Sequence, residues 1–272
     1  MPPAKLDRLN KRLQELDKVV VAFSGGVDST FLLRAAKDVL GRDRVLAVTA
    51  VSEIHPEGEI GDAKRLAKSI GARHLLVRSG EMEEDAFLTN PPERCYVCKK
   101  RVFGSLQILA AEQGFRHVID GTNADDAGDF RPGRKALHEL GILSPLQEAG
   151  FTKKEIRALS RKWGLPTWNR PALACLATRI PYGTRITPEL LMRIDAGETF
   201  LRKAGFVQIR VRDHGGIARI EIAPDEMPKV RKPGLAARIV KKFKSIGYDY
   251  VTVDLEGYRT GILNEALGKR KT

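Results

Sequence analysis

The chain has 272 residues, of which 42% are hydrophobic and 30% charged, so a sizeable core can be buried and a disordered protein is excluded. No apolar run approaches the roughly 18 residues that span a bilayer, and residues 1–10 lack the apolar stretch of a secretory signal. We therefore expect a soluble, cytoplasmic protein with no membrane partner. The net charge of +13 suggests a polyanionic partner, although it also fits an ordinary basic surface.

The first part of the chain alternates short apolar runs with amphipathic segments. Helices are predicted at 3–16, 30–40, 61–70, 98–113 and 152–163, the last opened by the capping-box sequence TKKE. Strands are predicted at 18–23, 45–50, 74–77, 117–120 and 142–146. This alternation indicates an α/β fold with a doubly wound, mostly parallel sheet. Ligands of such sheets bind in the loops at the carboxyl ends of the strands.

The pattern changes after residue 165. Residues 166–187 are rich in proline and predict a structured junction, which carries Cys175. Beyond it, helices are predicted at 188–204 and 234–246, and strands at 207–212, 217–222 and 250–253. We therefore expect a main domain at 1–165 and a smaller α+β domain for substrate binding or oligomerisation at 188–272.

The loop at 24–29 (SGGVDS) lies between the first predicted strand and the helix that follows it. Its candidate ATP ligands are Ser24, Gly25, Gly26, Asp28 and Ser29. The glycines allow close approach of the backbone to phosphates, and the hydroxyls and helix N–H groups can cradle an anion. The carboxylate suits a Mg²⁺ ion that bridges phosphates. An ordinary glycine-rich turn is the alternative, but this combination of residues is much more specific than an isolated glycine motif.

The three cysteines are Cys95 and Cys98, spaced as C-x-x-C, and Cys175 far along the chain. An odd number of cysteines is a poor disulfide framework, and the five histidines show no convincing zinc-ligand spacing. A redox pair, a zinc site and thiols without a metal all stay open. Three thiolates also suit a [4Fe–4S] cluster in which one iron lacks a protein ligand and could hold a transferable sulfide.

Several motifs follow one another along nearly the whole chain. They are SGGVDS at 24–29, RCYVCK at 94–99, GTNADD at 121–126 with RPG at 131–133, ACLATRIPYGTRIT at 174–187, RVRDH at 210–214 and ARIE at 218–221. The first resembles the PP-loop of the ATP pyrophosphatases, which cut ATP between its α- and β-phosphates. Together the motifs resemble the LarE family of ATP-dependent sulfur transferases, which serve the biosynthesis of a nickel-pincer nucleotide. The block ACLATRIPYG is the most specific of them.

The resemblance implies a PP-loop domain of the adenine nucleotide alpha hydrolase type and a definite reaction. ATP would adenylylate a carboxylate of pyridinium-3,5-biscarboxylic acid mononucleotide, pyrophosphate would leave, and sulfur would replace AMP to give a thiocarboxylate. Some members sacrifice the sulfur of the cysteine matching Cys175 and keep dehydroalanine, whereas others hold a [4Fe–4S] cluster on three cysteines. Because Cys95 and Cys98 are present too, we expect the cluster version, an external sulfur donor and a homo-oligomer.

The resemblance also implies roles for further residues. The segment after the fourth predicted strand closes over the nucleotide in this family, although a plain polar turn is the alternative. Its candidate residues here are Gly121, Thr122, Asn123 and Asp125. Arg210, Arg212 and Glu221 match positions linked to the substrate phosphate, although the arginines also fit a solvated basic face. Besides Cys175 and Asp28, the expected catalytic residues include Arg179, which could stabilise developing phosphate charge.

Two rival functions remain. PP-loop enzymes that thiolate tRNA also carry a C-x-x-C, a distant third cysteine and a cluster, and residues 229–244 hold seven Lys or Arg and no acid. We see no zinc-ribbon pattern and no basic-aromatic alternation, so the polar face of a surface helix is preferred and nucleic acid is not expected as a partner. A non-catalytic nucleotide- or RNA-binding module needs neither the SGGVDS loop nor the clustered cysteines.

Overall fold

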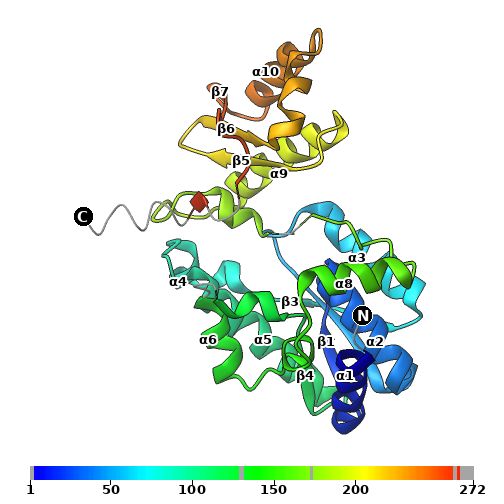
Figure 1. The fold of residues 1–272 in the computed structure, drawn as a ribbon. Helices are drawn as coiled ribbons and strands as arrows, with labels where there is room; N and C mark the ends of the chain where they lie inside the picture. The colour runs from blue at the N-terminus through cyan, green and yellow to red at the C-terminus, as the bar shows by residue number, and fades with distance from the viewer. Residues whose placement is uncertain (1–2, 129–131, 172–173, 260–261, 264–272) are drawn as a thin grey trace. The chain divides into compact units, whose positions relative to one another are not determined.

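The computed structural model describes residues 3–128, 132–171, 174–259 and 262–263. The chain divides into two compact units, one made of residues 1–84 with 93–173 and the other of residues 85–92 with 174–272 (Figure 1). Among the described helices, none is both long enough and apolar enough to cross a bilayer.

A four-stranded parallel sheet in the order β3-β2-β1-β4 forms the centre of the larger unit. Its strands are β1 (Val19–Ala22), β2 (Val45–Val51), β3 (Arg73–Arg78) and β4 (His117–Ile119). The helices of this unit are α1 (Pro3–Leu16), α2 (Val27–Leu40), α3 (Glu57–Ile70), α5 (Arg94–Glu112), α6 (Pro132–Glu139), α7 (Pro145–Glu148) and α8 (Lys153–Lys162), with the 3₁₀ turns η1 (Arg42–Arg44), η2 (Glu81–Glu83) and η3 (Ala124–Gly128). The predicted doubly wound α/β fold is confirmed.

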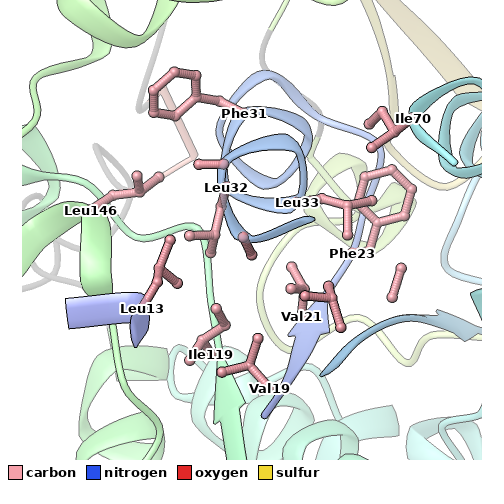
Figure 2. Close-up of a cluster of buried hydrophobic side chains, with 14 of the residues drawn as sticks. Leu13, Val19, Val21, Phe23, Phe31, Leu32, Leu33, Ile70, Ile119 and Leu146 are labelled. Atoms are coloured by element: carbon pink, nitrogen blue, oxygen red, sulfur yellow. The ribbon is translucent and has the colours of Figure 1, made fainter. Parts of the chain in front are cut away.

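The two faces of this sheet are covered by different helices, because side chains alternate along each strand. Val19 and Val21 of β1 belong to a core cluster with residues of α1, α2 and α8, part of which Figure 2 shows. Val20, between them, belongs to a second cluster with residues of α5 and α6. All three valines are fully buried, and each such burial contributes about 1.5–3 kcal/mol. The uninterrupted apolar run is thus explained by a sheet with two buried faces.

The capping box predicted at residues 152–155 is present and also binds the N-terminal helix. The Thr152 side chain accepts from the Glu155 backbone N–H, and the Glu155 side chain accepts from the Thr152 backbone N–H. Lys5 of α1 lies 2.8 Å from Glu155, from its Nζ atom to Oε2. The hydrogen bond from Lys5 and the backbone hydrogen bond from Thr152 lower the pKa of Glu155 to about 2.

Replacing Glu155 by Gln should lower the free energy of unfolding by about 1–2 kcal/mol at neutral pH, because the charged contacts with Lys5 are lost. A depressed carboxyl pKa contributes stability that is complete above the unfolded value of 4.5 and is lost as the pH falls through about 2. Urea unfolding of the wild type and the variant at pH 7 and pH 3.5 should therefore show a difference that shrinks with acid. The control is Glu148→Gln, which removes the more exposed pair with Arg12 of α1. A Glu155 difference that grows on acidification would contradict the assignment.

A three-stranded sheet in the order β5-β6-β7 forms the centre of the smaller unit, antiparallel between β5 and β6 and parallel between β6 and β7. Its elements are α4 (Asp85–Leu88), η4 (Leu176–Arg179), α9 (Pro188–Lys203), β5 (Ile209–Asp213), β6 (Ile217–Ile222), η5 (Pro224–Arg231), α10 (Leu235–Ser245) and β7 (Tyr250–Val253). As the sequence predicts, Thr187 caps α9 by accepting a hydrogen bond from the Leu190 backbone N–H. The smaller α+β fold is confirmed.

Three features differ from the sequence-based expectations. The fifth strand at 142–146 is wrong, because only a single parallel bridge between Ile119 and Leu143 forms before Pro145 begins α7. Helix α6, which begins at Pro132, was not among the predicted helices. The segment 85–92 belongs to the smaller unit, where the Asn90 side chain donates to the Pro181 carbonyl over 2.8 Å. The three-part division of the chain stays a prediction.

Candidate active site

The SGGVDS loop joins β1 to α2, and its backbone is suited to binding an anion. Gly25 has a φ of 72°, and Gly26 is the N-cap of α2 without a capping bond from any described side chain. The Ser24 and Ser29 hydroxyl oxygens lie 3.1 Å apart. The first N–H groups of a helix carry partial positive charge, so this end of α2 favours phosphate oxygens.

A cavity of about 300 Å³ opens beside this loop in the larger unit. Its lining includes Ser24, Gly26, Asp28, Ser29, Asp120, Gly121, Thr122 and Asp126. Apolar side chains line it as well, among them Val48, Val102, Phe103 and Leu106. The structure thus brings together the loops that follow β1 and β4, which a parallel sheet places at one edge.

The residues predicted after β4 divide into two groups. Gly121 fits closely against α2, since an added Cβ would lie 3.0 Å from the Ser29 backbone nitrogen. With Thr122 it lines the cavity. Asn123 and Asp125 shape the turn instead: the Asn123 side chain accepts from the Asp125 N–H over 3.0 Å.

Asp28 is held by a residue that sequence reasoning missed. The Lys153 ammonium donates to Asp28 Oδ2, and the Lys153 backbone N–H donates to Asp125 Oδ2 over 2.8 Å. Burial raises the pKa of Asp28, the Lys153 charge opposes this, and the nearby Asp126 charge raises it further. Asp28 Oδ1 is buried without a hydrogen-bond partner among the described residues. This orphaned oxygen in a residue that lines the cavity is suited to a cation.

The predicted cysteine ligands are divided between the two units. Cys95 and Cys98 lie near the start of α5, which begins at Arg94, and, three residues apart, they share a face of that helix. Cys95 is exposed and Cys98 half-buried. Cys175, also half-buried, precedes η4 in the smaller unit. Within each unit, the described residues contain no group of three or more His, Cys, Asp or Glu that could hold a metal.

Arg179 holds the turn that carries Cys175. Its Nη1 donates to the carbonyls of Ala174 and Cys175 over 2.7 and 2.9 Å. The same guanidinium forms two bonds with Glu198 of α9, of 2.8 and 3.0 Å, in a pair whose side chains are 2% and 0% exposed. Breaking such a buried pair costs about 3–5 kcal/mol, so the geometry gives Arg179 a positioning role. Its direct action on phosphate charge stays a prediction.

The predicted substrate arginines lie on β5 in different surroundings. Arg212 forms two bonds of 2.9 Å with Glu221 and donates to the Thr178 carbonyl over 2.6 Å. Arg210 lies over the Tyr258 ring, with 5.2 Å from its Cζ atom to the ring centroid. Burial, followed by the charge of Arg179, lowers the pKa of Arg210 to about 10. A buried guanidinium so close to other cations favours an anionic ligand.

The chain is similar to several known proteins. A family model described as NAD synthase matches residues 5–86. An uncharacterised protein of Synechocystis is 44% identical over 99% of this chain and 100% of its own length. A GMP synthase of Aeropyrum pernix is 30% identical over 56% of this chain and 33% of its own length.

A further relative carries a specific name. Pyridinium-3,5-bisthiocarboxylic acid mononucleotide synthase of Lactiplantibacillus plantarum is 41% identical over 94% of this chain and 92% of its own length. Similarity at this level extends over nearly the full length of both chains. The chain belongs to the LarE family, that of the pyridinium-3,5-bisthiocarboxylic acid mononucleotide synthases.

Proposed function

We propose that the protein is an ATP-dependent sulfur transferase. It adenylylates a carboxylate of pyridinium-3,5-biscarboxylic acid mononucleotide, releases pyrophosphate and inserts sulfur to give a thiocarboxylate. The observation that carries the proposal is the near full-length match to a pyridinium-3,5-bisthiocarboxylic acid mononucleotide synthase. The cavity at the SGGVDS loop is consistent with the adenylylating half of the reaction.

The ATP half is assigned to the larger unit. Phosphate oxygens bind the Gly26 N–H, the hydroxyls of Ser24 and Ser29 and the first turn of α2, whose dipole favours negative charge. The adenine ring lies against the apolar wall that includes Phe103. Asp28 would hold a Mg²⁺ ion, since its Oδ1 is otherwise unpartnered among the described residues. Lys153, the present partner of Asp28, would then be available to a phosphate oxygen.

The sulfur half is assigned to the three cysteines. The spacing of Cys95 and Cys98 in one helical turn fits two ligands of a single cluster, and Cys175 would be the third. A [4Fe–4S] cluster so held supplies an iron without a protein ligand, which can carry sulfide. An external donor would have to replace the sulfide that is transferred. Such chemistry suits the cytoplasm, where thiols stay reduced.

The proposal is tested by pyrophosphate release from Mg-ATP, using anaerobic protein reconstituted with iron and sulfide. Two substrates are compared, the dicarboxylated pyridinium mononucleotide and unmodified tRNA. We expect stimulation by the small nucleotide alone. Stimulation by tRNA alone would contradict the proposal and identify a tRNA thiolase. Against RNA, the cations of residues 229–244 lie around α10, whose buried side chains Leu235, Ile239 and Phe243 mark an ordinary amphipathic surface helix.

Loss of Arg210 or Arg212 should weaken the binding of the pyridinium nucleotide more than the binding of ATP. Arg210→Ala should weaken substrate binding by about 2 kcal/mol, the loss of one charge-assisted contact. Arg212→Ala should in addition destabilise the fold by about 2–3 kcal/mol, below the full cost of a broken buried pair, because Arg219 still pairs with Glu221 at 3.1 Å. Calorimetric titration with each ligand and thermal unfolding check both statements. Equal losses for ATP and substrate would contradict the assignment.

A further inference from the structure

Arg170 connects the phosphate loop to a neighbouring helix. Its Nη1 donates to the Gly25 carbonyl over 3.0 Å, and its Nη2 pairs with Asp62 of α3. The backbone of Arg170 is itself fixed, because Arg157 of α8 donates to the Arg170 carbonyl over 2.8 Å. All of these residues lie in the larger unit, and among them only Gly25 was singled out from the sequence.

This contact determines which way one peptide group of the loop faces. In a trans peptide the C=O and N–H bonds point in opposite directions. Since the Gly25 carbonyl faces Arg170, the Gly26 N–H faces the other side, where the Ser24 hydroxyl lies 3.3 Å away. Consistent with this, Gly26 lines the cavity and Gly25 does not.

The two glycines make this orientation easy to lose. Neither has a Cβ, so the peptide plane between them can rotate at low steric cost. Rotation by half a turn would direct the Gly25 carbonyl oxygen at the phosphates and withdraw the Gly26 N–H from them. The loop that suits a phosphate is therefore also able to adopt an orientation that repels one.

We propose that Arg170 and Asp62 are positioning residues that hold the peptide between Gly25 and Gly26 with its N–H toward the nucleotide phosphates. The inference deepens the proposed ATP site and rests on it. Arg170 acts through the carbonyl that it binds, and Asp62 acts by orienting Arg170. Gly25 also packs on α3, since an added Cβ would lie 3.5 Å from Ala63, one residue from Asp62.

The variant Asp62→Asn separates this role from simple electrostatics. Removing a negative charge near an anion site would by itself tighten the binding of ATP. If Asp62 orients Arg170, the same change loosens the clamp, and the Kd for Mg-ATP in calorimetry should rise on the order of tenfold. Arg170→Lys should show a similar loss, because one ammonium cannot serve both Gly25 and Asp62 with the geometry of a guanidinium.

Arg65→Gln is the matched control. Arg65 is the exposed second partner of Asp62, and its side chain is 73% accessible. The substitution should therefore leave the Kd for Mg-ATP unchanged within about twofold. Tighter or unchanged binding in Asp62→Asn with a folded protein would overturn the proposal. If that variant does not fold, Arg170→Lys decides in its place, and an unchanged Kd there would overturn the proposal as well.

Amide hydrogen exchange of Gly26 in the ligand-free protein gives a readout that does not depend on ATP. The Gly26 N–H should exchange at a different rate, with a shifted nitrogen resonance, in Asp62→Asn and Arg170→Lys but not in Arg65→Gln. An identical signal in all four proteins would overturn the clamp. Failure of the wild type to bind Mg-ATP would instead count against the proposed function, so the two failures can be told apart.

Discussion

Replacing Asp28 by Asn should reduce pyrophosphate release from Mg-ATP by about a thousandfold or more while the larger unit stays folded. Asn keeps the size of the side chain but removes the charge that a magnesium ion needs. Stability should change by less than about 1 kcal/mol, because losing the pair with Lys153 is offset by the relief of a desolvated carboxylate.

The control for this variant is Asp38→Asn on the same helix, which removes an exposed pair with Arg34 and should leave turnover unchanged. Acidification gives an independent check. Because burial raises the pKa of Asp28 above 3.8, protons should compete with Mg²⁺ at a higher pH than for an exposed aspartate. The affinity of the wild type for Mg-ATP should fall in that range, and the variant should lack this step. Full turnover in Asp28→Asn would remove the phosphate-loop role.

The local chemistry of the chain made most elements predictable. The apolar run at 18–23 can only be buried on both faces, and Thr152 and Thr187 cap helices where their hydroxyls meet free N–H groups. The 142–146 run failed as a strand because Pro145, with a fixed φ and no N–H, begins a helical turn after one bridge. Apolar character alone cannot distinguish a buried strand from a short helical turn.

The residues that support the site were harder to find, because their partners are distant in sequence. Lys153 and Glu198 look like ordinary helix charges until the fold places them beside Asp28 and Arg179. Arg170 likewise gains its meaning only through a carbonyl 145 residues away. Motifs identify groups that meet ligands, whereas the residues that orient those groups are recognised by contacts that no local pattern contains.

The three cysteine variants should show which metal site the chain holds. After anaerobic reconstitution, we expect the wild type to bind about four irons with as many sulfides. Cys95→Ser, Cys98→Ser and Cys175→Ser should each lose most of both, because two thiolates hold such a cluster poorly. The affinity for Mg-ATP should stay unchanged in all three variants, since none of these thiols lines the cavity beside the SGGVDS loop. Iron and sulfide analysis, together with the visible absorption of the cluster, measures the effect.

The pattern across the three variants carries more information than any one of them. A zinc site or a redox pair built on the C-x-x-C alone makes Cys95 and Cys98 essential and Cys175 dispensable. A sacrificial cysteine reverses this: Cys175 alone is essential, and mass spectrometry after turnover finds dehydroalanine at that position. If the three thiols bind one cluster, each of the three substitutions should have the same effect, and Cys175 should be intact after turnover. Unaltered iron content in all three variants would contradict the cluster. The assignment of the ATP site would not be affected, because the variant Asp28→Asn tests it separately.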